Sequence, residues 1–171
     1  GTTVCANGGY NSISVMAIAE EGNFLNAPDT YMQKIATGPE GKGVVEISET
    51  PRENLKRLAE VKKCRMQDLT AVILDRPRHE DLIEAVRSTG ARIQLIGDGD
   101  VAAAIATSMP DTGVDILFGT GGAPEGVIAA AALRCIGGEF QGILKPRNDE
   151  EIERAKRMGV ADINKTWMIE E

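Results

Sequence analysis

The feature that most constrains this sequence is a pattern that occurs twice within residues 92–126. In each copy an apolar run is followed by a loop of glycine and acidic residues, and the loop leads into an alanine-rich segment. The first copy predicts a strand at residues 93–96 and a helix at 101–109, and the second predicts a strand at 114–118 and a helix at 127–136. Strands that alternate with helices favour a parallel sheet covered by helices, and ligands bind beyond the carboxyl ends of such strands. We therefore expect the two loops to face one pocket.

The same alternation continues on both sides of this stretch. Thr50 precedes a proline and lies three residues before Glu53, which is the signature of a capped helix start, and the helix should cover residues 51–63. Apolar spacing and breaking residues predict four further elements: a strand at 69–74, a helix at 79–89, a strand at 139–144 and a helix that begins at Asn148 and closes at Gly159. The sequence thus predicts an α/β fold with four strands and five helices after residue 50.

The first third of the chain has a different pattern. Apolar and polar residues alternate over residues 12–19, which predicts a strand, and shorter apolar runs predict strands at 24–25, 31–36 and 44–47. Glycine- and proline-containing turns separate these runs. We expect an antiparallel meander that has no helix of its own.

Both ends of the sequence resemble the interior of a longer chain. The sequence has no initiator methionine, and its last residues carry no capping or turn signal. We expect a domain boundary near residue 50, with residues 1–49 as the closing strands of an N-terminal α+β half. Residues 50–171 are then an α/β substrate-binding domain that is truncated at its C-terminal end.

Charge and composition exclude some classes of partner. The formal net charge is −7, and the 19 lysine and arginine residues form no long basic run, so a nucleic-acid partner is not expected. No apolar stretch approaches the roughly 20 residues of a membrane-spanning helix. Cys5, Cys64 and Cys135 are scattered without metal-ligand spacing, which is typical of reduced thiols in a cytoplasmic protein. An acidic protein can still bind a phosphate through local arginines, helix N-termini or a metal ion.

Two acidic residues flank a glycine in the first loop, at Asp98, Gly99 and Asp100. One interpretation is structural, because an acid at a helix start caps the helix and complements its dipole. The other is functional, because two carboxylates directly after a buried strand are suitable acceptors for sugar hydroxyls or ligands for a divalent cation.

The second loop, residues 119–126, contains four glycines, Pro124 and Glu125. Its spacing matches neither the dinucleotide-binding fingerprint nor the phosphate-binding P-loop. Glu125 lies at the predicted start of a helix, where it could be a metal ligand or a general base. The alternative is a tight turn in which Glu125 complements the helix dipole.

Arginines on either side of a proline, at Arg76, Pro77 and Arg78, follow the strand predicted at 69–74. Two guanidinium groups on a rigid turn can bind one phosphate, although a solvated turn is the alternative. Three nearby candidates have structural interpretations by default: His79 as a helix cap or an exposed residue, Tyr31 as a half-buried packing residue and Lys34 as a solvated charge. Arginines, carboxylates and glycine N–H groups in one pocket favour metal-assisted hydrolysis of a phosphate ester.

Several of these motifs, in this order and spacing, resemble the class II fructose-1,6-bisphosphatases, including the cyanobacterial type that also accepts sedoheptulose 1,7-bisphosphate. The resemblance covers essentially the whole chain and rests on Arg76-Pro77-Arg78-His79, Asp98-Gly99-Asp100-Val101, Gly121-Gly122-Ala123-Pro124-Glu125-Gly126 and residues 130–138. It implies the layered αβαβα sandwich of the inositol monophosphatase-like sugar phosphatases, represented here by part of the first sheet and most of the second α/β domain. It also implies removal of the 1-phosphate with Mn²⁺ or Mg²⁺, in gluconeogenesis or carbon fixation.

The resemblance also implies roles for individual residues. Thr2, with Gly1, looks like the end of the family's metal loop and would orient the attacking water, and Glu125 would be a metal ligand close to that water. The residues that would contact the substrate are Gly1, Thr2, Tyr31, Arg76, Pro77, Arg78, Asp98, Gly99, Asp100 and Gly122.

One family metal ligand, Glu125, lies within this sequence, so we expect the chain by itself to be inactive. We expect a cytoplasmic homo-oligomer that acts on a small sugar bisphosphate and binds neither nucleic acid nor membranes. Two other functions stay open at this point. One is a non-catalytic domain that binds phosphosugars, and the weaker one is an oxidoreductase that uses a nucleotide cofactor.

Overall fold

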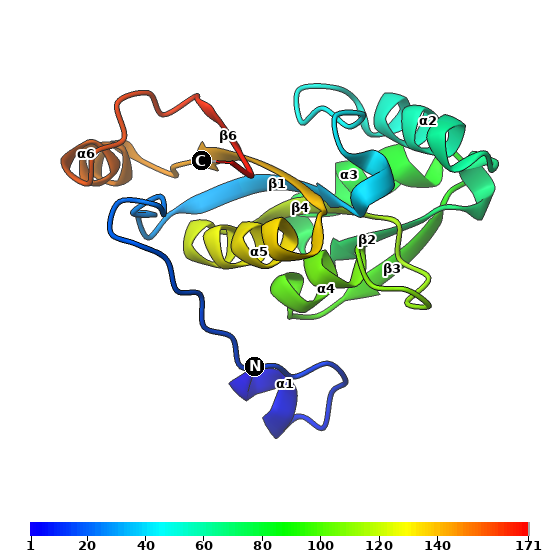
Figure 1. Ribbon diagram of the computed structural model, residues 1–171, viewed down its shortest axis with the longest axis horizontal. Helices are drawn as coiled ribbons and strands as arrows, with labels where there is room; N and C mark the ends of the chain where they lie inside the picture. The colour runs from blue at the N-terminus through cyan, green and yellow to red at the C-terminus, as the bar shows by residue number, and fades with distance from the viewer. Residues whose placement is uncertain (171) are drawn as a thin grey trace.

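The computed structural model describes residues 1–170 and contains one sheet with the strand order β3-β2-β4-β1-β5-β6 (Figure 1). The strands are β1 (Tyr31–Thr37), β2 (Thr70–Leu74), β3 (Arg92–Ile96), β4 (Ile116–Gly122), β5 (Glu139–Lys145) and β6 (Thr166–Met168). β2 pairs in parallel with β3 and β4, whereas β1 lies antiparallel between β4 and β5. The short strand β6, which the sequence pattern did not predict, pairs antiparallel with β5.

Helices cover both faces of this sheet. The helices are α1 (Thr2–Ala6), α2 (Pro51–Lys62), α3 (Glu80–Arg87), α4 (Asp100–Ala106), α5 (Ala123–Ile136) and α6 (Asp149–Arg157), with 3₁₀ turns η1 (Pro39–Gly41), η2 (Met66–Asp68) and η3 (Pro77–His79). Figure 1 shows α2 and α3 on one face and α4 and α5 on the other. The predicted α/β class is therefore confirmed. Among the described helices, none has the length and hydrophobicity that a membrane crossing requires.

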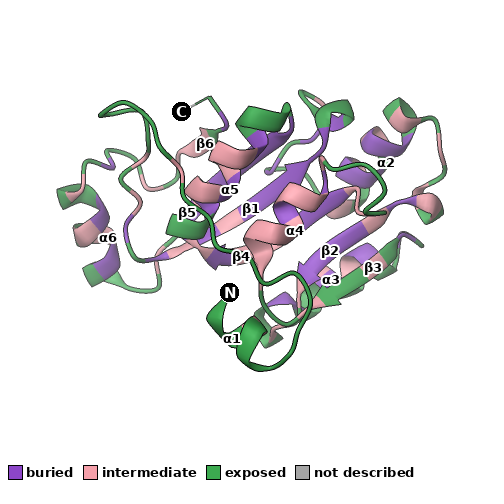
Figure 2. Ribbon diagram, turned by 60° about the horizontal axis from the view of Figure 1, so that its bottom comes forward, coloured by how far each residue is buried: buried purple, intermediate pink, exposed green. Residues whose placement is uncertain are grey.

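The two faces of the sheet have separate hydrophobic cores, because successive residues of a strand point to opposite sides. On β1, Ile35 joins the core beneath α2 and α3, where Leu58 is also fully buried. Met32 of the same strand joins the core beneath α4 and α5, together with Leu133 of α5. Figure 2 shows buried residues along the central strands and on the helices that cover them. Both cores hold the central strands, and with them the strand ends, in fixed positions.

Local signals predicted the starts of α2 and α6 correctly. The hydroxyl of Thr50 accepts a hydrogen bond from the Glu53 N–H at 3.2 Å, as the capping pattern requires. The side chain of Asn148 caps α6 in the same way by accepting from the Glu151 N–H at 3.0 Å. The second glycine loop differs from the prediction, since β4 continues to Gly122 and α5 begins immediately after it. Pairing with β1 along its whole length keeps these glycines in the strand.

The antiparallel meander predicted for the first third is wrong, because β1 is the one strand that the structure forms there. The expectation that this third has no helix is also wrong, since α1 lies within it. The predicted strands at 12–19 and 24–25 belong to an irregular stretch, residues 7–30, which we call the arm. Alternation stabilises a strand only when one of its faces is buried, and Val15 on the predicted apolar face is 43% exposed. The segment at 44–47 is also not a strand, although Val45 and Ile47 are buried, because the Gln141 side chain hydrogen bonds to their backbone groups.

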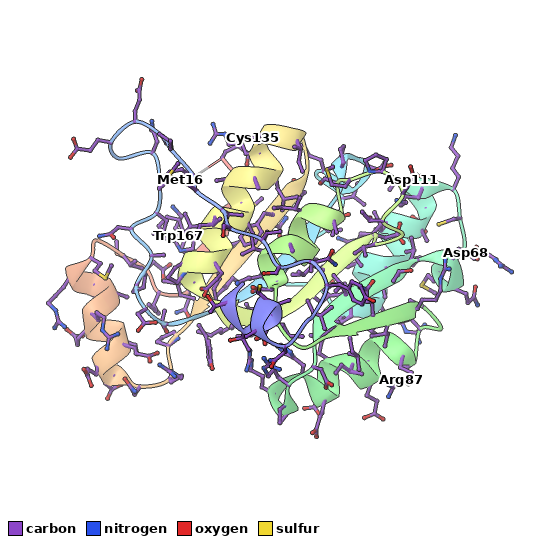
Figure 3. All side chains as sticks on the ribbon, turned by 90° about the horizontal axis from the view of Figure 1, so that it is seen from below. Met16, Asp68, Arg87, Asp111, Cys135 and Trp167 are labelled. Carbon is purple, nitrogen blue, oxygen red and sulfur yellow. The ribbon has the colours of Figure 1, made fainter. Side chains whose placement is uncertain are left out.

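The arm leads away from the sheet and passes along α5. Residues 14–19 of the arm and the outer face of α5 line one cavity, which includes Cys135. Figure 3 shows Met16 on this part of the arm. β1, which precedes the boundary expected near residue 50, is hydrogen bonded on both sides to strands that follow it. The described residues therefore share one sheet across this position, and a division of the full-length protein there stays a prediction.

Candidate active site

The carboxyl ends of β2, β3, β4 and β5 meet at one edge of the sheet, together with the amino end of β1. Tyr31 opens β1 and lies opposite Gly122 of β4 and Lys145 of β5. The segments 75–79 and 97–100 follow β2 and β3 at the same edge. We call this region the strand-end edge. The fold thus brings together most of the predicted site residues from distant parts of the sequence.

A small cavity at this edge lies between the two predicted loops. Asp100 of the first loop and Gly119, Thr120 and Gly121 of the second line it, together with Lys34. Residues of both predicted loops therefore line one cavity, but its volume is only about 10 Å³, so a ligand pocket between the loops stays a prediction. Larger cavities lie elsewhere, for example between the arm and α5.

Arg76 binds an acidic residue of the neighbouring loop. Its Nη2 lies 2.9 Å from Oδ1 of Asp98, and its Nη1 donates to the Asp75 carbonyl at 2.8 Å. Pro77 follows as the first residue of η3 and sets the direction of the turn. Arg76, which the sequence suggested as a phosphate ligand, is thus paired with Asp98, which it suggested as a sugar ligand.

Arg78 extends from the end of β2 across β4 to β1. Its Nε and Nη2 donate to the Thr120 carbonyl at 3.0 and 2.8 Å. Its guanidinium carbon lies 4.9 Å from the centre of the Tyr31 ring, within the range of a cation–π contact. Tyr31 is half-buried, as expected. Arg78 forms no ion pair with any residue between 1 and 170, so its charge is available to an anion.

Lys34 is not a solvated charge, and this default interpretation is wrong. The residue is 4% exposed, on the central strand β1, and its Nζ lies 2.8 Å from Oδ2 of Asp100. A Cβ at Gly121 would lie 2.6 Å from the same Oδ2, so a larger residue here would have to displace the carboxylate. Gly99 has a φ of +90° and forms the N-cap of α4 in the left-handed region that glycine favours. Together these residues set the position of the Asp100 carboxylate.

Glu125 lies in the first turn of α5 and is exposed. Its carboxylate folds back over Gly122, where a Cβ would be 2.0 Å from Oε2. It forms no hydrogen bond or ion pair within the part of the chain that the structure describes. A free carboxylate at a helix start beside the strand-end edge is available to a cation.

The described residues do not by themselves fit the metal centre that the resemblance implies. No group of three or more His, Cys, Asp or Glu side chains within residues 1–170 is close enough to hold a metal ion. Glu125 would be a single ligand, and metal sites in proteins need several. Any metal chemistry would therefore require ligands from outside this stretch.

His79 is buried, with 2% exposure, and links the ends of two strands. It occupies the N-cap position of α3, but its side chain forms no capping hydrogen bond, and it is not exposed. Its Nδ1 lies 2.8 Å from the Leu74 carbonyl, and its Nε2 accepts from the Thr120 N–H at 2.8 Å. Burial lowers the pKa of His79, and a neutral ring with its proton on Nδ1 satisfies both bonds. His79 is thus a structural link between β2 and β4.

Sequence reasoning missed three residues at this edge: Arg147, Glu151 and Thr30. The guanidinium carbon of Arg147 lies 5.1 Å from the centre of the Tyr31 ring. Arg147 is paired with Glu151, which is 3% exposed and also accepts a hydrogen bond from the Thr30 hydroxyl at 2.7 Å. The signal that could have found Arg147 is its position: like Arg78, it follows a proline at the end of a strand.

Gly1 and Thr2 are not part of the strand-end edge in this structure. Thr2 is the first residue of α1. This helix has no buried residue and lies below the sheet in Figure 1. The Gly1 carbonyl accepts a hydrogen bond from the Ser12 hydroxyl at 2.9 Å, within the first part of the chain. Their roles in the site stay predictions.

The chain thus has an α/β fold in which arginine, lysine and carboxylate side chains lie together at the ends of the strands. A family model described as "Bacterial fructose-1,6-bisphosphatase, glpX-encoded" matches residues 1–171. The chain therefore belongs to the family of glpX-type, class II fructose-1,6-bisphosphatases.

Curated relatives agree with this assignment. The chain is 45% identical, over its whole length, to the D-fructose 1,6-bisphosphatase class 2/sedoheptulose 1,7-bisphosphatase of Synechococcus sp. (strain JA-2-3B'a(2-13)), of which it covers 53%. It is 46% identical over 98% of its length to the protein of the same name from Prochlorococcus marinus (strain NATL1A), of which it covers 54%. The chain thus spans about half the length of the curated relatives that it matches.

Proposed function

We propose that the full-length protein that carries this chain is a phosphatase that hydrolyses the 1-phosphate of fructose 1,6-bisphosphate. The observation that carries the proposal is the strand-end edge, where the guanidinium of Arg78 has no carboxylate partner and Asp98 and Asp100 lie on the adjacent loop. The relatives are named for this substrate and for sedoheptulose 1,7-bisphosphate, which is the second candidate substrate. Hydrolysis adds water across the phosphorus–oxygen ester bond and releases fructose 6-phosphate and inorganic phosphate.

We assign the roles within the edge by chemistry. Arg76 and Arg78 bind phosphate oxygens, because a guanidinium offers paired N–H donors. Asp98 and Asp100 accept hydrogen bonds from sugar hydroxyls, and their pairing with Arg76 and Lys34 holds them in place. Pro77, Gly99 and Gly122 shape the backbone beside the substrate. Tyr31 contributes an aromatic surface.

We also propose that the reaction depends on a divalent cation, Mn²⁺ or Mg²⁺, and that Glu125 is one of its ligands. Its exposed carboxylate at the start of α5 supports this role. The other ligands would have to lie outside residues 1–170, and Gly1 and Thr2 would have to move to the edge for Thr2 to orient water. A cytoplasmic location and a homo-oligomeric state are part of the same proposal, and sedimentation of the full-length protein tests the second.

The proposal is tested by phosphate release from fructose 1,6-bisphosphate with the full-length protein, with and without Mn²⁺. We compare the wild type with Glu125→Gln and with the control Glu84→Gln, which changes an exposed glutamate on α3. We expect turnover that requires the cation and is lost in Glu125→Gln alone. Turnover that survives this substitution would remove Glu125 from the site. No turnover, together with tight binding of the sugar phosphate without metal, would favour a non-catalytic binding domain.

A further inference from the structure

Arg147 lies at the strand-end edge, although no motif of the sequence pointed to it. It follows β5 by two residues, on the loop that leads to α6. Its guanidinium carbon is 5.1 Å from the centre of the Tyr31 ring, and that of Arg78 is 4.9 Å from the same centre. Arg78 approaches from the β4 side of β1 and Arg147 from the β5 side. Two guanidinium groups from opposite sides of the strand thus meet at one aromatic ring.

Each of these guanidinium groups has unused hydrogen-bond donors. Arg147 donates from Nε to Oε1 of Glu151 at 2.7 Å and from Nη2 to the same oxygen. Arg78 uses its Nε and Nη2 for the Thr120 carbonyl. Since a guanidinium has five N–H groups, about three remain on each residue. The side chain of Arg147 is 57% exposed, so these donors are accessible to a ligand.

The position of Arg147 is held from behind by a buried carboxylate. Glu151 is 3% exposed, accepts from the Arg147 backbone N–H at 2.8 Å and accepts from the Thr30 hydroxyl at 2.7 Å. Thr30 immediately precedes Tyr31, so this network ties the loop after β5 to the start of β1. A buried charge is stable only when it is paired, and here the pairing also fixes the guanidinium beside the ring.

The two guanidinium groups differ in their partners. Glu151 pairs with Arg147, whereas Arg78 has no carboxylate partner within residues 1–170. A phosphate group has three terminal oxygens and a charge near −2, so it accepts charge-assisted hydrogen bonds from a guanidinium that has free donors.

We propose that Arg147 is a substrate-binding residue that, with Arg78 and Tyr31, holds the phosphate that stays on the sugar. Glu151 is then a positioning residue that keeps the Arg147 guanidinium at the ring. The identity of the ligand, a sugar bisphosphate, rests on the proposed function. The assignment of Arg147 as a residue that binds this ligand rests on the geometry of the edge.

The test uses the full-length protein and two substrates, fructose 1,6-bisphosphate and fructose 1-phosphate, which lacks the second phosphate. For Arg147→Gln we expect the KM for the bisphosphate and the Kd for fructose 6-phosphate, by calorimetry, to rise about tenfold or more, the usual effect of losing a charge-assisted hydrogen bond. The kcat for the bisphosphate and the KM for fructose 1-phosphate should stay within about twofold. Arg147→Lys keeps the charge and loses the paired donors, so its KM and Kd should lie between those of the wild type and those of Arg147→Gln. Arg157→Gln, at the exposed last residue of α6, is the matched control.

Glu151→Gln should also raise the KM for the bisphosphate and the Kd for fructose 6-phosphate, but by a smaller factor than Arg147→Gln. If Arg147→Gln fails to fold because Glu151 is left unpaired, the double variant Arg147→Gln/Glu151→Gln removes both charges and allows the same comparison. Unchanged constants for the bisphosphate and for fructose 6-phosphate would overturn the proposal, as would an equal loss with both substrates.

Failure of the proposed function is distinguishable from failure of this inference. If the wild type hydrolyses neither substrate, the phosphatase proposal fails and calorimetry with fructose 6-phosphate decides about Arg147. Weaker binding by Arg147→Gln would then support its role. Equal binding, or no binding by the wild type, would overturn it.

Discussion

At the scale of single residues, the strand-end edge depends on glycines where a side chain would collide with a charged group. A Cβ at Gly121 would lie 2.6 Å from a carboxylate oxygen of Asp100, and one at Gly122 would lie 2.0 Å from a carboxylate oxygen of Glu125. These glycines let the backbone of β4 approach the acids closely. The buried Lys34 forms an ion pair with one of these acids, Asp100.

Adding a methyl group at Gly121 should therefore destabilise the fold. We expect Gly121→Ala to lower the free energy of unfolding by about 1–3 kcal/mol, since the new atom must displace the Asp100 carboxylate from Lys34. Gly97→Ala is the control, because a Cβ at Gly97 meets nothing within 4 Å. Urea denaturation of the two variants measures the difference. Equal midpoints would show that the edge can accommodate the methyl group.

The buried charge of Lys34 leads to a second prediction. Lys34→Met keeps the aliphatic stem but removes the hydrogen bond at 2.8 Å to Asp100. We expect a loss of about 1–3 kcal/mol in the free energy of unfolding, because a partly buried carboxylate loses its charged partner. Lys56→Met, at an exposed position of α2, should change stability by less than about 0.5 kcal/mol. An equally small effect of Lys34→Met would show that the pair contributes little to stability.

At the scale of elements, the edge depends on how the strands are ordered. β1 runs antiparallel between two strands that point the other way, so its amino end meets their carboxyl ends. The loops after β2 and β5 both carry a proline followed by an arginine, and both arginines reach the Tyr31 ring. The start of α6 completes this arrangement, because Glu151 in its first turn bonds to Thr30 before β1 and to Arg147 after β5.

The network of Glu151, Arg147 and Thr30 should make the free energy of unfolding depend on pH. The side-chain hydrogen bond from Arg147, with those from the Arg147 backbone and Thr30, lowers the pKa of Glu151 from 4.5 to about 2. A folded-state pKa below the unfolded one gives stability that is present above about pH 4.5 and is lost as the pH falls towards 2. We therefore expect Glu151→Gln to flatten the fall in unfolding free energy between about pH 5 and pH 2.

The comparison is made by urea denaturation at a series of pH values. Glu150→Gln on the same helix, with an exposed side chain, is the control and should keep the wild-type slope. Asp68, whose pKa is also lowered to about 2 by Arg65, contributes to every variant, so a residual slope is expected. Identical slopes for the wild type and Glu151→Gln would contradict the prediction.

At the scale of the whole molecule, one sheet with a hydrophobic core on each face positions the edge. α1 has no buried residue, and the arm packs against the second core only near its end, through Leu25 and Ala27. The chain covers 53% of a relative to which it is 45% identical. Glu125 is the one acid at the start of α5 that is free to bind a cation, and no cluster of metal-binding side chains exists within residues 1–170.

The 171-residue chain alone should therefore release no phosphate from fructose 1,6-bisphosphate, with or without Mn²⁺. A coupled phosphate assay measures this, and calorimetry with fructose 6-phosphate on the same preparation shows whether the edge still binds ligand. Metal-dependent release by the isolated chain would contradict the prediction and would mean that its own residues complete the site.

The sequence by itself determined the helices α2 to α6, the central strands and the family, whereas α1 was not predicted. Capping at Thr50 and Asn148 and the apolar spacing of α2 and α3 are local signals, so they could be read without knowledge of distant contacts. The arginine, acid and glycine motifs were likewise recognisable because each is contiguous in the chain.

Only the tertiary structure decided which of these residues meet and which are buried. The pattern at 12–19 is that of a strand, but no neighbouring strand pairs with it, and a strand needs a partner for its hydrogen bonds. Lys34 has the sequence context of a solvated residue and is buried because Asp100, 66 positions away, supplies its counter-charge. Arg147 lies 116 positions from Tyr31 (147 − 31) and meets it only because β5 pairs with β1. Pairing between strands and between charges is a long-range property, and it is this property that converts separate motifs into one site.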